Sequence, residues 1–228
     1  MTMKMSIPIL ILFVFAQLAF AAHNGKHQKV TAYDYHDFTN SNIQSKTFNR
    51  YEGGGVYTEA WSFDRTVAGQ VTRTEITSIP GSDPIEYVRC MINIFQPTAL
   101  AFNWIQNNAC DPYYDPPLTL VTREYNPLVP TLSSAMVPGV AWGSGSVLTE
   151  TPGSERYYVD KNEVLGVEDI SVPAGNFTGC LKLHRLRYVD SSSYARIDWI
   201  CPNMGLVKRV HGGGTGRMME LVDVIYNQ

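Results

Sequence analysis

The chain has 228 residues and a formal net charge of −3 at neutral pH, with 18 lysine and arginine residues against 21 aspartate and glutamate residues. Charged residues make up 17% of the chain, compared with about 25% in an average soluble domain. The negative net charge argues against a general affinity for nucleic-acid phosphates. The 44% content of hydrophobic residues excludes a disordered chain, and the length suits one well-filled domain.

The N-terminus has the pattern of a secretory signal peptide. Lys4 supplies the only charge in the first 21 residues, residues 7–20 form an apolar run, and residues 19–21 (Ala-Phe-Ala) offer the small residues that a signal peptidase recognises. The apolar run is shorter than the ~20 residues of a membrane-spanning helix. We therefore expect export, to the periplasm or the medium, after cleavage near Ala21, with no transmembrane segment in the mature chain.

Four cysteines agree with export, because an even number of cysteines in an exported chain indicates disulfides. The sequence allows three pairings, and the short, nearly equal spacings favour Cys90–Cys110 and Cys180–Cys201. None of the four lies in a Cys-x-x-Cys pair, and no histidine stands at ligand spacing to them. A zinc site is therefore not expected.

Residues 22–50 form a polar N-terminal segment without a sustained hydrophobic period, and residues 51–228 are expected to form a single β-rich domain. Within the domain, strand-like runs and breaks alternate. Strands are predicted at residues 70–79, 85–95 and 118–125, a short helix or buried turn at 98–106, a loop at 107–117, and a covering loop or soft boundary at 126–154. In one of these strands Cys90 shares a face with Val88 and Ile92, so Cys90 is expected to point into the core.

The C-terminal third contains five strand candidates separated by short turn sequences. They occupy residues 163–172, 177–189, 194–201, 206–210 and 218–226. Strands this close together, with no helix between them, pair as an antiparallel meander.

One hairpin of this meander would bring Cys180 close to Cys201. With Val189 opposite Tyr194, the two cysteines would be two positions out of register, so a one-residue bulge is needed to align them. The apolar residues change face near His184, where such a bulge would fit.

No amphipathic helix pattern of convincing length occurs in residues 22–228. The predicted fold is all-β and mainly antiparallel, with at most one short helix after the signal peptide. A sheet with one apolar side must cover that side. The sheet is therefore expected to curve into a half-barrel or a barrel, or to pack as a sandwich.

Patterns for catalysis, metals and cofactors are weak. The nucleophile motif G-x-S-x-G is absent, and the glycine-rich residues 211–216 match neither a phosphate loop nor a dinucleotide turn. Residues 33–37 (YDYHD) could bind a metal or form a solvated strand end, and residues 110–117 could bind carbohydrate or form a disulfide-tied surface loop. We predict no catalytic residue, metal site or cofactor, and the binding residues stay unidentified.

Further single residues were weighed as site candidates. Asn176 begins a glycosylation sequon. The histidines are His23, His27, His36, His184 and His211, and rim or partly buried positions are expected for them. Carboxylates that could serve a hydrolase are Glu150, Glu155, Glu163, Glu168 and Asp169, with nothing in the sequence to rank them.

Two motifs in the C-terminal third carry a resemblance. Residues 166–177 contain V-P-A-G-N-F, and residues 199–208 read W-I-C-P-N-M-G-L-V-K. This resembles the pattern V-P-A-G-x-F followed by W-x-x-P-x-x-G-x-V-K in a family of uncharacterised exported bacterial proteins. Those proteins are similar to the half-barrels of lipoprotein carriers, in which a curved antiparallel sheet wraps an apolar groove. The resemblance covers about residues 160–225, implies no catalytic residue, and departs from the pattern at Cys180 and Cys201.

The sequence thus predicts an exported, non-catalytic protein that binds an apolar or extended ligand, or a protein partner, on the concave face of a sheet. The ligand or partner is not identified, and nucleic acid is not expected. Two alternatives stay open: a secreted carboxylate-dependent hydrolase, and a structural or surface-interaction protein. Candidates to line a groove, or else to fill the core, are Trp61, Trp104, Trp142 and Trp199.

Overall fold

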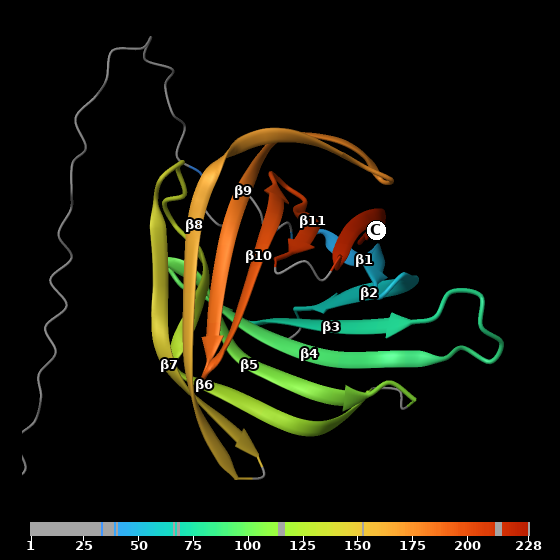
Figure 1. The fold of residues 1–228 in the computed structure, drawn as a ribbon, viewed down its shortest axis with the longest axis horizontal. Helices are drawn as coiled ribbons and strands as arrows, with labels where there is room; N and C mark the ends of the chain where they lie inside the picture. Colours follow the sequence, from blue (N-terminus) through green and yellow to red (C-terminus); the bar gives the residue numbers. More distant parts are fainter. Residues whose placement is uncertain are drawn as a thin grey trace, which may run out of the picture. The chain divides into compact units, whose positions relative to one another are not determined.

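The computed structural model describes residues 33, 39, 41–65, 67, 69–113, 117–151, 153–212 and 216–227. Twelve antiparallel strands form a closed barrel, in which each strand pairs with its neighbours in the sequence and β1 pairs with β12 (Figure 1). The described residues contain no helix. The strands are β1 (Ile43–Glu52), β2 (Gly55–Asp64), β3 (Val71–Ser78), β4 (Tyr87–Pro97), β5 (Ala101–Asp111), β6 (Leu118–Ser133), β7 (Ala141–Thr151), β8 (Ser154–Val172), β9 (Gly175–Val189), β10 (Ser192–Cys201), β11 (Gly205–His211) and β12 (Met218–Tyr226).

The all-β, antiparallel prediction is confirmed, and the sheet is a closed barrel. The half-barrel that the resemblance implies and the sandwich are both wrong for this chain. Closure depends on β1 and β2, for which the sequence patterns predict no strand. Since β1 starts at Ile43, the barrel begins inside the segment expected to be a polar N-terminal extension. The expected signal peptide at residues 1–21 lies outside the described residues.

The predicted strands at residues 70–79 and 85–95 correspond to β3 and β4, and the prediction at 118–125 covers the first half of β6. The five C-terminal candidates correspond to β8–β12 and pair as a meander. The two motifs that carry the resemblance include the turns of this meander, with Pro173 and Ala174 between β8 and β9 and residues 202–204 between β10 and β11.

Three segments differ from expectation. Residues 98–106, predicted as a helix or a buried turn, and residues 107–111, predicted as loop, lie largely within β5. Residues 126–154 contain the end of β6 and all of β7 rather than a covering loop. Glycine in β7 serves close strand approach, because a Cβ atom at Gly143 would lie 2.1 Å from the carbonyl oxygen of Asp160 on β8. A glycine- and proline-rich composition was therefore a poor guide to loops here.

Cys90 lies on the outer face of the barrel, not in its interior as the pattern suggested. Its neighbour Arg89 and, further along β4, Asn93 and Phe95 line the interior cavity. Strand alternation then places Val88 and Cys90 on the outside, and Val88 is 56% exposed. The inward face of β4 is therefore mixed, with Arg89 and Asn93 beside Phe95, while Cys90 on the outer face is still buried, at 5% exposed.

The β9–β10 hairpin needs no bulge to align its cysteines. Val189 pairs with Ser192, and Leu181 pairs with Ile200, without a register shift between them. This register places Cys180 directly opposite Cys201, two positions away from the register expected from the sequence. The apparent change of face near His184 is also absent, because the inward face continues from leucine into arginine.

Both disulfides connect neighbouring strands. Cys90–Cys110 joins β4 to β5 with a Cα–Cα distance of 5.0 Å, and Cys180–Cys201 joins β9 to β10 with a Cα–Cα distance of 4.1 Å. The pairing is the one that the spacings favour, and no free cysteine is present.

Replacing Cys180 and Cys201 together with alanine should lower the free energy of unfolding by roughly 3 kcal/mol, because the unfolded chain loses a closed loop. Urea denaturation of the wild type and the double variant measures this difference. Unfolded but unreduced wild-type protein should titrate no free thiols. Four titratable thiols in that sample, or equal stability of the two proteins, would contradict the bridge.

Candidate functional site

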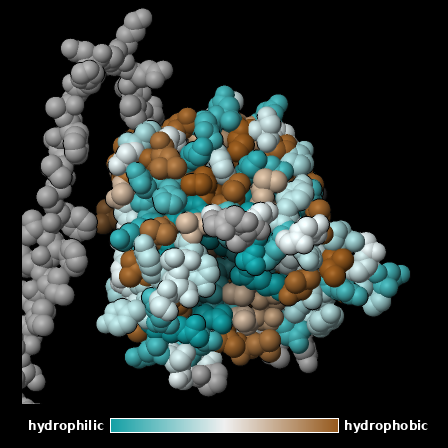
Figure 2. Space-filling view, in the orientation of Figure 1, coloured by the Kyte–Doolittle hydropathy of each residue, from teal (hydrophilic) through white to brown (hydrophobic). Residues whose placement is uncertain are grey.

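The interior of the barrel contains a cavity of about 520 Å³. In the space-filling view the barrel is hollowed near the centre of the face shown, and hydrophilic residues surround the hollow (Figure 2). The cavity is within the 300–1,000 Å³ range of small-molecule pockets, which are usually lined by mostly apolar side chains. Its lining is rich in charge, because 15 of the 40 residues that form it are arginine, lysine, aspartate or glutamate.

All eleven arginines of the chain line this one cavity. They are Arg50, Arg65, Arg73, Arg89, Arg123, Arg156, Arg185, Arg187, Arg196, Arg209 and Arg217. Among the lysines, Lys46 also lines it, whereas Lys161, Lys182 and Lys208 occupy outward-facing positions of β8, β9 and β11. Among the described residues, all arginines therefore line the cavity, with Arg89, Arg156 and Arg217 exposed to solvent, whereas Lys46 is the one described lysine that lines it.

Strand alternation explains how the arginines reach the interior. Arg185 and Arg187 are two residues apart on β9, and the pair Arg196 and Asp198 has the same spacing on β10. On β9 the same face begins with Leu183, which is fully buried. β9 thus starts in an apolar core and continues along the same face as cavity wall, whereas the antiparallel β10 passes from the cavity wall at Arg196 to the buried Ile200.

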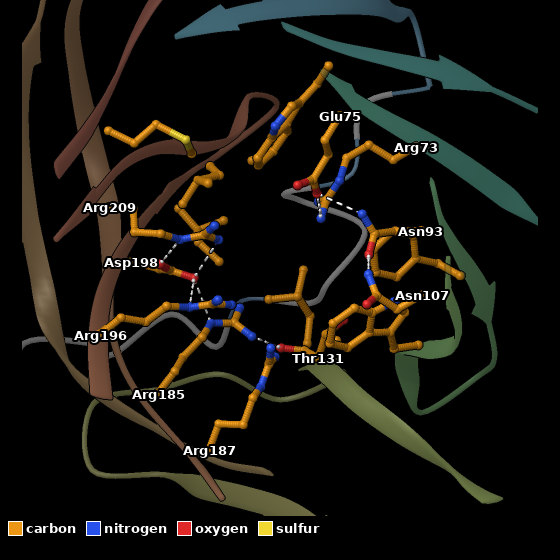
Figure 3. A pocket seen from close by; sticks show the side chains of 18 of the residues that line it. Arg73, Glu75, Asn93, Asn107, Thr131, Arg185, Arg187, Arg196, Asp198 and Arg209 are labelled. Atoms are coloured by element: carbon orange, nitrogen blue, oxygen red, sulfur yellow. Dashed lines mark hydrogen bonds and ion pairs between the residues drawn. The ribbon is translucent and has the colours of Figure 1, made fainter. Parts of the chain in front are cut away.

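Three arginines surround one carboxylate, and we call this group the Asp198 cluster (Figure 3). The Nε atoms of Arg185 and Arg209 lie 2.9 and 2.8 Å from the two Asp198 oxygens, and the Nε atom of Arg196 lies 3.3 Å from Oδ2. Arg185 also donates through Nη1 to the carbonyl oxygen of Thr131, at 3.0 Å. Arg209 also donates to Asp198 through Nη2, at 3.3 Å, whereas the Nε atoms of Arg185 and Arg196 lie within ion-pair distance but make no hydrogen bond.

The electrostatics of this cluster are set by its excess of positive charge. Asp198 is 1% exposed. Burial alone would raise its pKa, but Arg196, Arg209 and Arg185 outweigh burial and hold the pKa of Asp198 well below its usual range. Burial, followed by the charge of Arg209, lowers the pKa of Arg196. Arg196 is therefore a cation whose charge its surroundings do not fully compensate.

A second network, the Glu75 chain, comes from β3, β4 and β5 and faces the Asp198 cluster across the cavity (Figure 3). Arg73 Nη2 lies 2.5 Å from Glu75 Oε1. The amide of Asn93 donates to the same Glu75 oxygen at 2.8 Å, and the amide of Asn107 donates to Asn93 Oδ1 at 2.7 Å. Glu75, the one carboxylate of this network, thus holds Arg73 and Asn93 through a single oxygen, Oε1.

Aromatic rings lie against the guanidinium groups of Arg73 and Arg187. The Arg73 guanidinium lies 4.1 Å from the ring centroid of Trp61 and 4.9 Å from that of Phe95. The Arg187 guanidinium lies 4.8 Å from the Trp104 centroid. Such stacking holds a guanidinium flat and leaves its N–H edge available to a ligand.

The carboxylates near the cavity are fewer than the arginines. Nine arginines form ion pairs with six carboxylates, which leaves three positive charges unmatched within these pairs before Lys46 is counted. The arginines are Arg50, Arg73, Arg123, Arg156, Arg185, Arg187, Arg196, Arg209 and Arg217, and the carboxylates are Glu52, Glu59, Glu75, Glu150, Asp160 and Asp198. Since the whole chain has a net charge of −3, the residues outside this group carry a net negative charge.

Two further titratable groups line the cavity. Burial, with the charges of Arg73 and Arg65, lowers the pKa of Lys46 to about 7. Its ammonium group donates to the carbonyl oxygens of Met204 and Leu206. Burial, followed by the charges of Arg209 and Arg196, lowers the pKa of His211 to about 4. Near neutral pH, His211 is therefore uncharged and Lys46 is partly charged.

The four tryptophans divide between inside and outside. Trp61 and Trp104 line the cavity. Trp142 packs against the larger apolar core and donates to the carbonyl oxygen of Pro130. Trp199 occupies the outer face of β10 and donates to Glu168. Only half of the residues expected to line a groove therefore do so.

The carboxylates considered for a hydrolase do not converge in a cleft. Glu150 is paired with Arg123 at 3.3 Å. Glu168 pairs with Lys182 on the outside of the barrel. The others, Glu155, Glu163 and Asp169, are exposed.

The remaining candidates are in scattered positions. His211 lines the cavity, whereas His184 lies between inward-facing residues of β9 and so points outward. Asn176 is exposed at the start of β9. Of the cluster at residues 33–37 only Tyr33 is described, and it pairs with Met136 through two backbone hydrogen bonds. His23, His27 and His36, and parts of the segments 110–117 and 211–216, lie outside the described residues.

The arginines are the cavity-lining residues that sequence reasoning missed. The signal was present as charged residues two positions apart, at Arg73 and Glu75 and at Arg196 and Asp198. Such spacing within a strand places both side chains on one face. An alternating strand is usually taken to have its polar face in solvent, which led away from this cavity.

Comparison with known proteins adds two similar folds. No family model matches the chain, and no curated protein matches it. A candidate lipoprotein from Parabacteroides distasonis matches with a TM-score of 0.48 and 14% identity, over 82% of this chain and 97% of its own. A candidate exported protein with a YmcC-like fold from Bacteroides fragilis matches with a TM-score of 0.49 and 13% identity, over 86% of this chain and 100% of its own. These similarities concern the path of the backbone and assign no function.

The described residues contain neither a candidate membrane-spanning helix nor a candidate metal site. No helix in that part of the chain is long and apolar enough to cross a membrane. The same residues contain no group of three or more histidine, cysteine, aspartate or glutamate side chains placed to hold a metal ion.

Replacing Asp198 with asparagine should lower the free energy of unfolding by about 3–5 kcal/mol at pH 7, because three buried or half-buried arginines lose their shared carboxylate. Urea denaturation measures the change. The exposed Glu155→Gln is the matched control, since it also removes one negative charge, and it should change stability by less than about 0.5 kcal/mol. Equal effects of the two substitutions would contradict the role of Asp198.

The free energy of unfolding of Asp198→Asn should depend less on pH in the acidic range than that of the wild type. A carboxyl group whose pKa is depressed by folding stabilises the protein above the pKa of the unfolded state, about 4, and loses that contribution as the pH falls further. The wild type should therefore lose more stability than Asp198→Asn between about pH 4 and pH 2. Parallel acid titrations at fixed urea concentration, followed by tryptophan fluorescence, test this difference.

Proposed function

We propose that the protein is exported and binds a small organic anion inside its barrel. Export is supported by the signal-peptide pattern of residues 1–21 and by the two disulfides, which suit an oxidising compartment. We propose further that the signal peptide is cleaved near Ala21. Binding is supported by the lining of the cavity.

The observation that carries the proposal is the position of the arginines. All eleven line one cavity, whereas the described lysines other than Lys46 lie outside. If positive charge served only solubility, it would lie on the surface, where the chain instead carries net negative charge. Concentrating cations in an interior raises the energy of the folded state. A negatively charged ligand compensates this charge.

The choice of arginine over lysine indicates the chemistry of that ligand. A guanidinium group presents up to five N–H donors in a planar fork that fits the two oxygens of a carboxylate, sulfate or phosphate. The side chain of Arg196 is 21% exposed, compared with 15% for Arg209 and 7% for Arg185. Arg196 is therefore the arginine of the Asp198 cluster that a ligand can reach most directly.

The lining also argues against the ligands expected from the sequence. A neutral apolar molecule would leave the arginines uncompensated. A neutral sugar offers hydroxyl donors, yet the carboxylates that could accept them are already paired with arginine, as Glu75 and Asp198 show. An acidic molecule with an apolar part fits both the arginines and the aromatic rings Trp61 and Trp104 beside them.

No specific observation favours the two alternatives. A carboxylate hydrolase needs a carboxyl group with a raised pKa to act as general acid, whereas Asp198 and Glu59 in the cavity have lowered pKa values. Strand addition by a partner needs a free sheet edge. Each of the twelve described strands pairs with two neighbours, which closes the barrel, although residues 165–172 of β8 extend beyond the end of β7 and pair on one side only, with β9.

Isothermal titration calorimetry with naphthalene-2-sulfonate and its uncharged analogue 2-naphthol tests the proposal. The two probes share a ring system and differ in charge. The sulfonate should bind at least about tenfold tighter, and its affinity should fall as sodium chloride is raised. Equal affinities for the two probes, or no binding of the sulfonate, would exclude an anion site in the lumen.

The Arg196→Gln variant localises the site. It should weaken sulfonate binding about tenfold. The free energy of unfolding should stay close to that of the wild type, because the charge of Arg209 repels that of Arg196 and because Asp198 keeps its ion pairs with Arg185 and Arg209. Lys161→Gln is the control, since it removes one positive charge from an exposed position. Similar losses in the two variants would show that net charge alone, and not the lumen, controls binding.

Binding should strengthen as the pH falls from 8 to 6, because Lys46, with a pKa of about 7, gains its proton in this interval. His211 titrates near pH 4 and contributes little there. We expect a three- to tenfold rise in sulfonate affinity for the wild type, as one added charge near the ligand contributes ~1 kcal/mol. Lys46→Met should flatten this pH profile. An unchanged profile in that variant would exclude Lys46 as its origin.

A further inference from the structure

We infer that the ligand is an aromatic anion with two acidic groups, one held at Arg73 and one at Arg187 and the Asp198 cluster, with its body along the aromatic side chains between them. This inference rests on the proposed function and specifies the ligand of the same cavity. Three observations carry it: the two separated cationic walls, the aromatic row that joins them, and buried donors without acceptors.

The first observation is the separation of the cations into two walls. Arg73 belongs to the Glu75 chain on β3–β5, and the Asp198 cluster belongs to β9–β11, on the facing side of the cavity (Figure 3). Lys46 adds to the first wall, since Arg73 contributes to its lowered pKa. Arg187 adds to the second, and its one ion pair, to Asp160, is long at 3.4 Å. Because the two walls face each other across the cavity, a ligand with an acidic group at each end can engage both of them.

The second observation is the continuous aromatic row between the walls. The Arg73 guanidinium lies 4.9 Å from the Phe95 centroid, the Phe95 and Trp104 rings stack at 6.4 Å, and the Arg187 guanidinium lies 4.8 Å from the Trp104 centroid. Tyr125 extends the row, with its ring 5.0 Å from that of Trp104. A flat apolar body lying between two acidic groups matches this arrangement.

The third observation is a set of buried donors without hydrogen bonds. The indole nitrogen Nε1 of Trp104 and the Nε atom of Arg73 are both buried and have no acceptor among the described residues. Trp104 is 8% exposed and lines the cavity. Native proteins rarely leave such groups unpaired. Both are donors, so the missing partner is an acceptor, which an acidic oxygen supplies.

The position of Trp104 connects the three observations. Its ring is covered by the Arg187 guanidinium, so an anion that binds Arg187 arrives beside the indole N–H. An inorganic anion would engage one wall and leave the aromatic row without a partner. An aliphatic diacid would reach both walls but would gain less from the rings.

Calorimetric titration of the mature protein, without the proposed signal peptide, with four probes tests the inference. They are naphthalene-2,6-disulfonate, naphthalene-2-sulfonate, octanedioate and inorganic sulfate. The disulfonate should bind at least about tenfold tighter than each of the other three. If the disulfonate binds no tighter than the monosulfonate, or if octanedioate or sulfate equals it, the inference is wrong.

Trp104→Phe keeps an aromatic ring in the row and removes the indole N–H together with the pyrrole part of the ring. It should weaken disulfonate binding about tenfold, because the ligand loses a buried donor. Trp199→Phe, which removes an indole donor on the outer face, should leave the affinity unchanged. Unchanged disulfonate affinity in Trp104→Phe would overturn the role of this donor.

The outcomes distinguish the proposed anion-binding cavity from the inferred ligand with two acidic groups. If naphthalene-2-sulfonate binds in an Arg196-dependent manner and the disulfonate gains nothing, the anion-binding lumen stands and the two-group ligand fails. If none of the four anions binds the wild type, both fail. Binding of the disulfonate that survives Arg73→Gln and Arg187→Gln together would place it outside the two walls and also reject the inference.

Discussion

The folded barrel has to hold more guanidinium groups in its interior than it has carboxylates to pair with them. Asp198 illustrates the constraint, because one carboxylate serves Arg185, Arg196 and Arg209 together. Without it, the inward faces of β9, β10 and β11 would repel one another. The arrangement of the cavity, the depressed pKa of Asp198 and the lowered pKa of Lys46 all follow from this shared interior.

Some sequence patterns predict the strands and disulfides of this fold, and others leave the inward face of a strand undetermined. Strand alternation and turn chemistry identify β8–β12, and cysteine spacing favours the pairs that the structure contains. Alternation does not say which face points inward. With Val88 and Cys90 as the apolar face of β4, the inward side was assigned to the wrong residues, because the interior of this barrel is polar.

The register of the β9–β10 hairpin shows the same limit. The turn residues allow more than one loop length, and the chain uses the shorter one, with Val189 opposite Ser192. The bulge was inferred from leucines that seem to change face, whereas Arg185 and Arg187 continue the inward face. Strands β1, β2 and β7 were not predicted, since polar and glycine-containing segments become strands here only through pairing with partners distant in the sequence. The site itself required the closed barrel, because it combines residues from most of the strands.

The disulfides have a consequence for the site beyond general stability. Cys90–Cys110 joins β4 to β5, the strands that carry Asn93 and Asn107 of the Glu75 chain. Cys180–Cys201 joins β9 to β10, the strands that carry most of the Asp198 cluster. Each bridge thus fixes, from the outer face, the two strands whose inner faces form one charged wall. Covalent links of this kind oppose the separation that repulsion between arginines favours, and they hold the donors in place before a ligand arrives. Preorganised donors lose less entropy on binding than mobile ones do, so under the proposed function the same bridges would prepare the cavity for its anion.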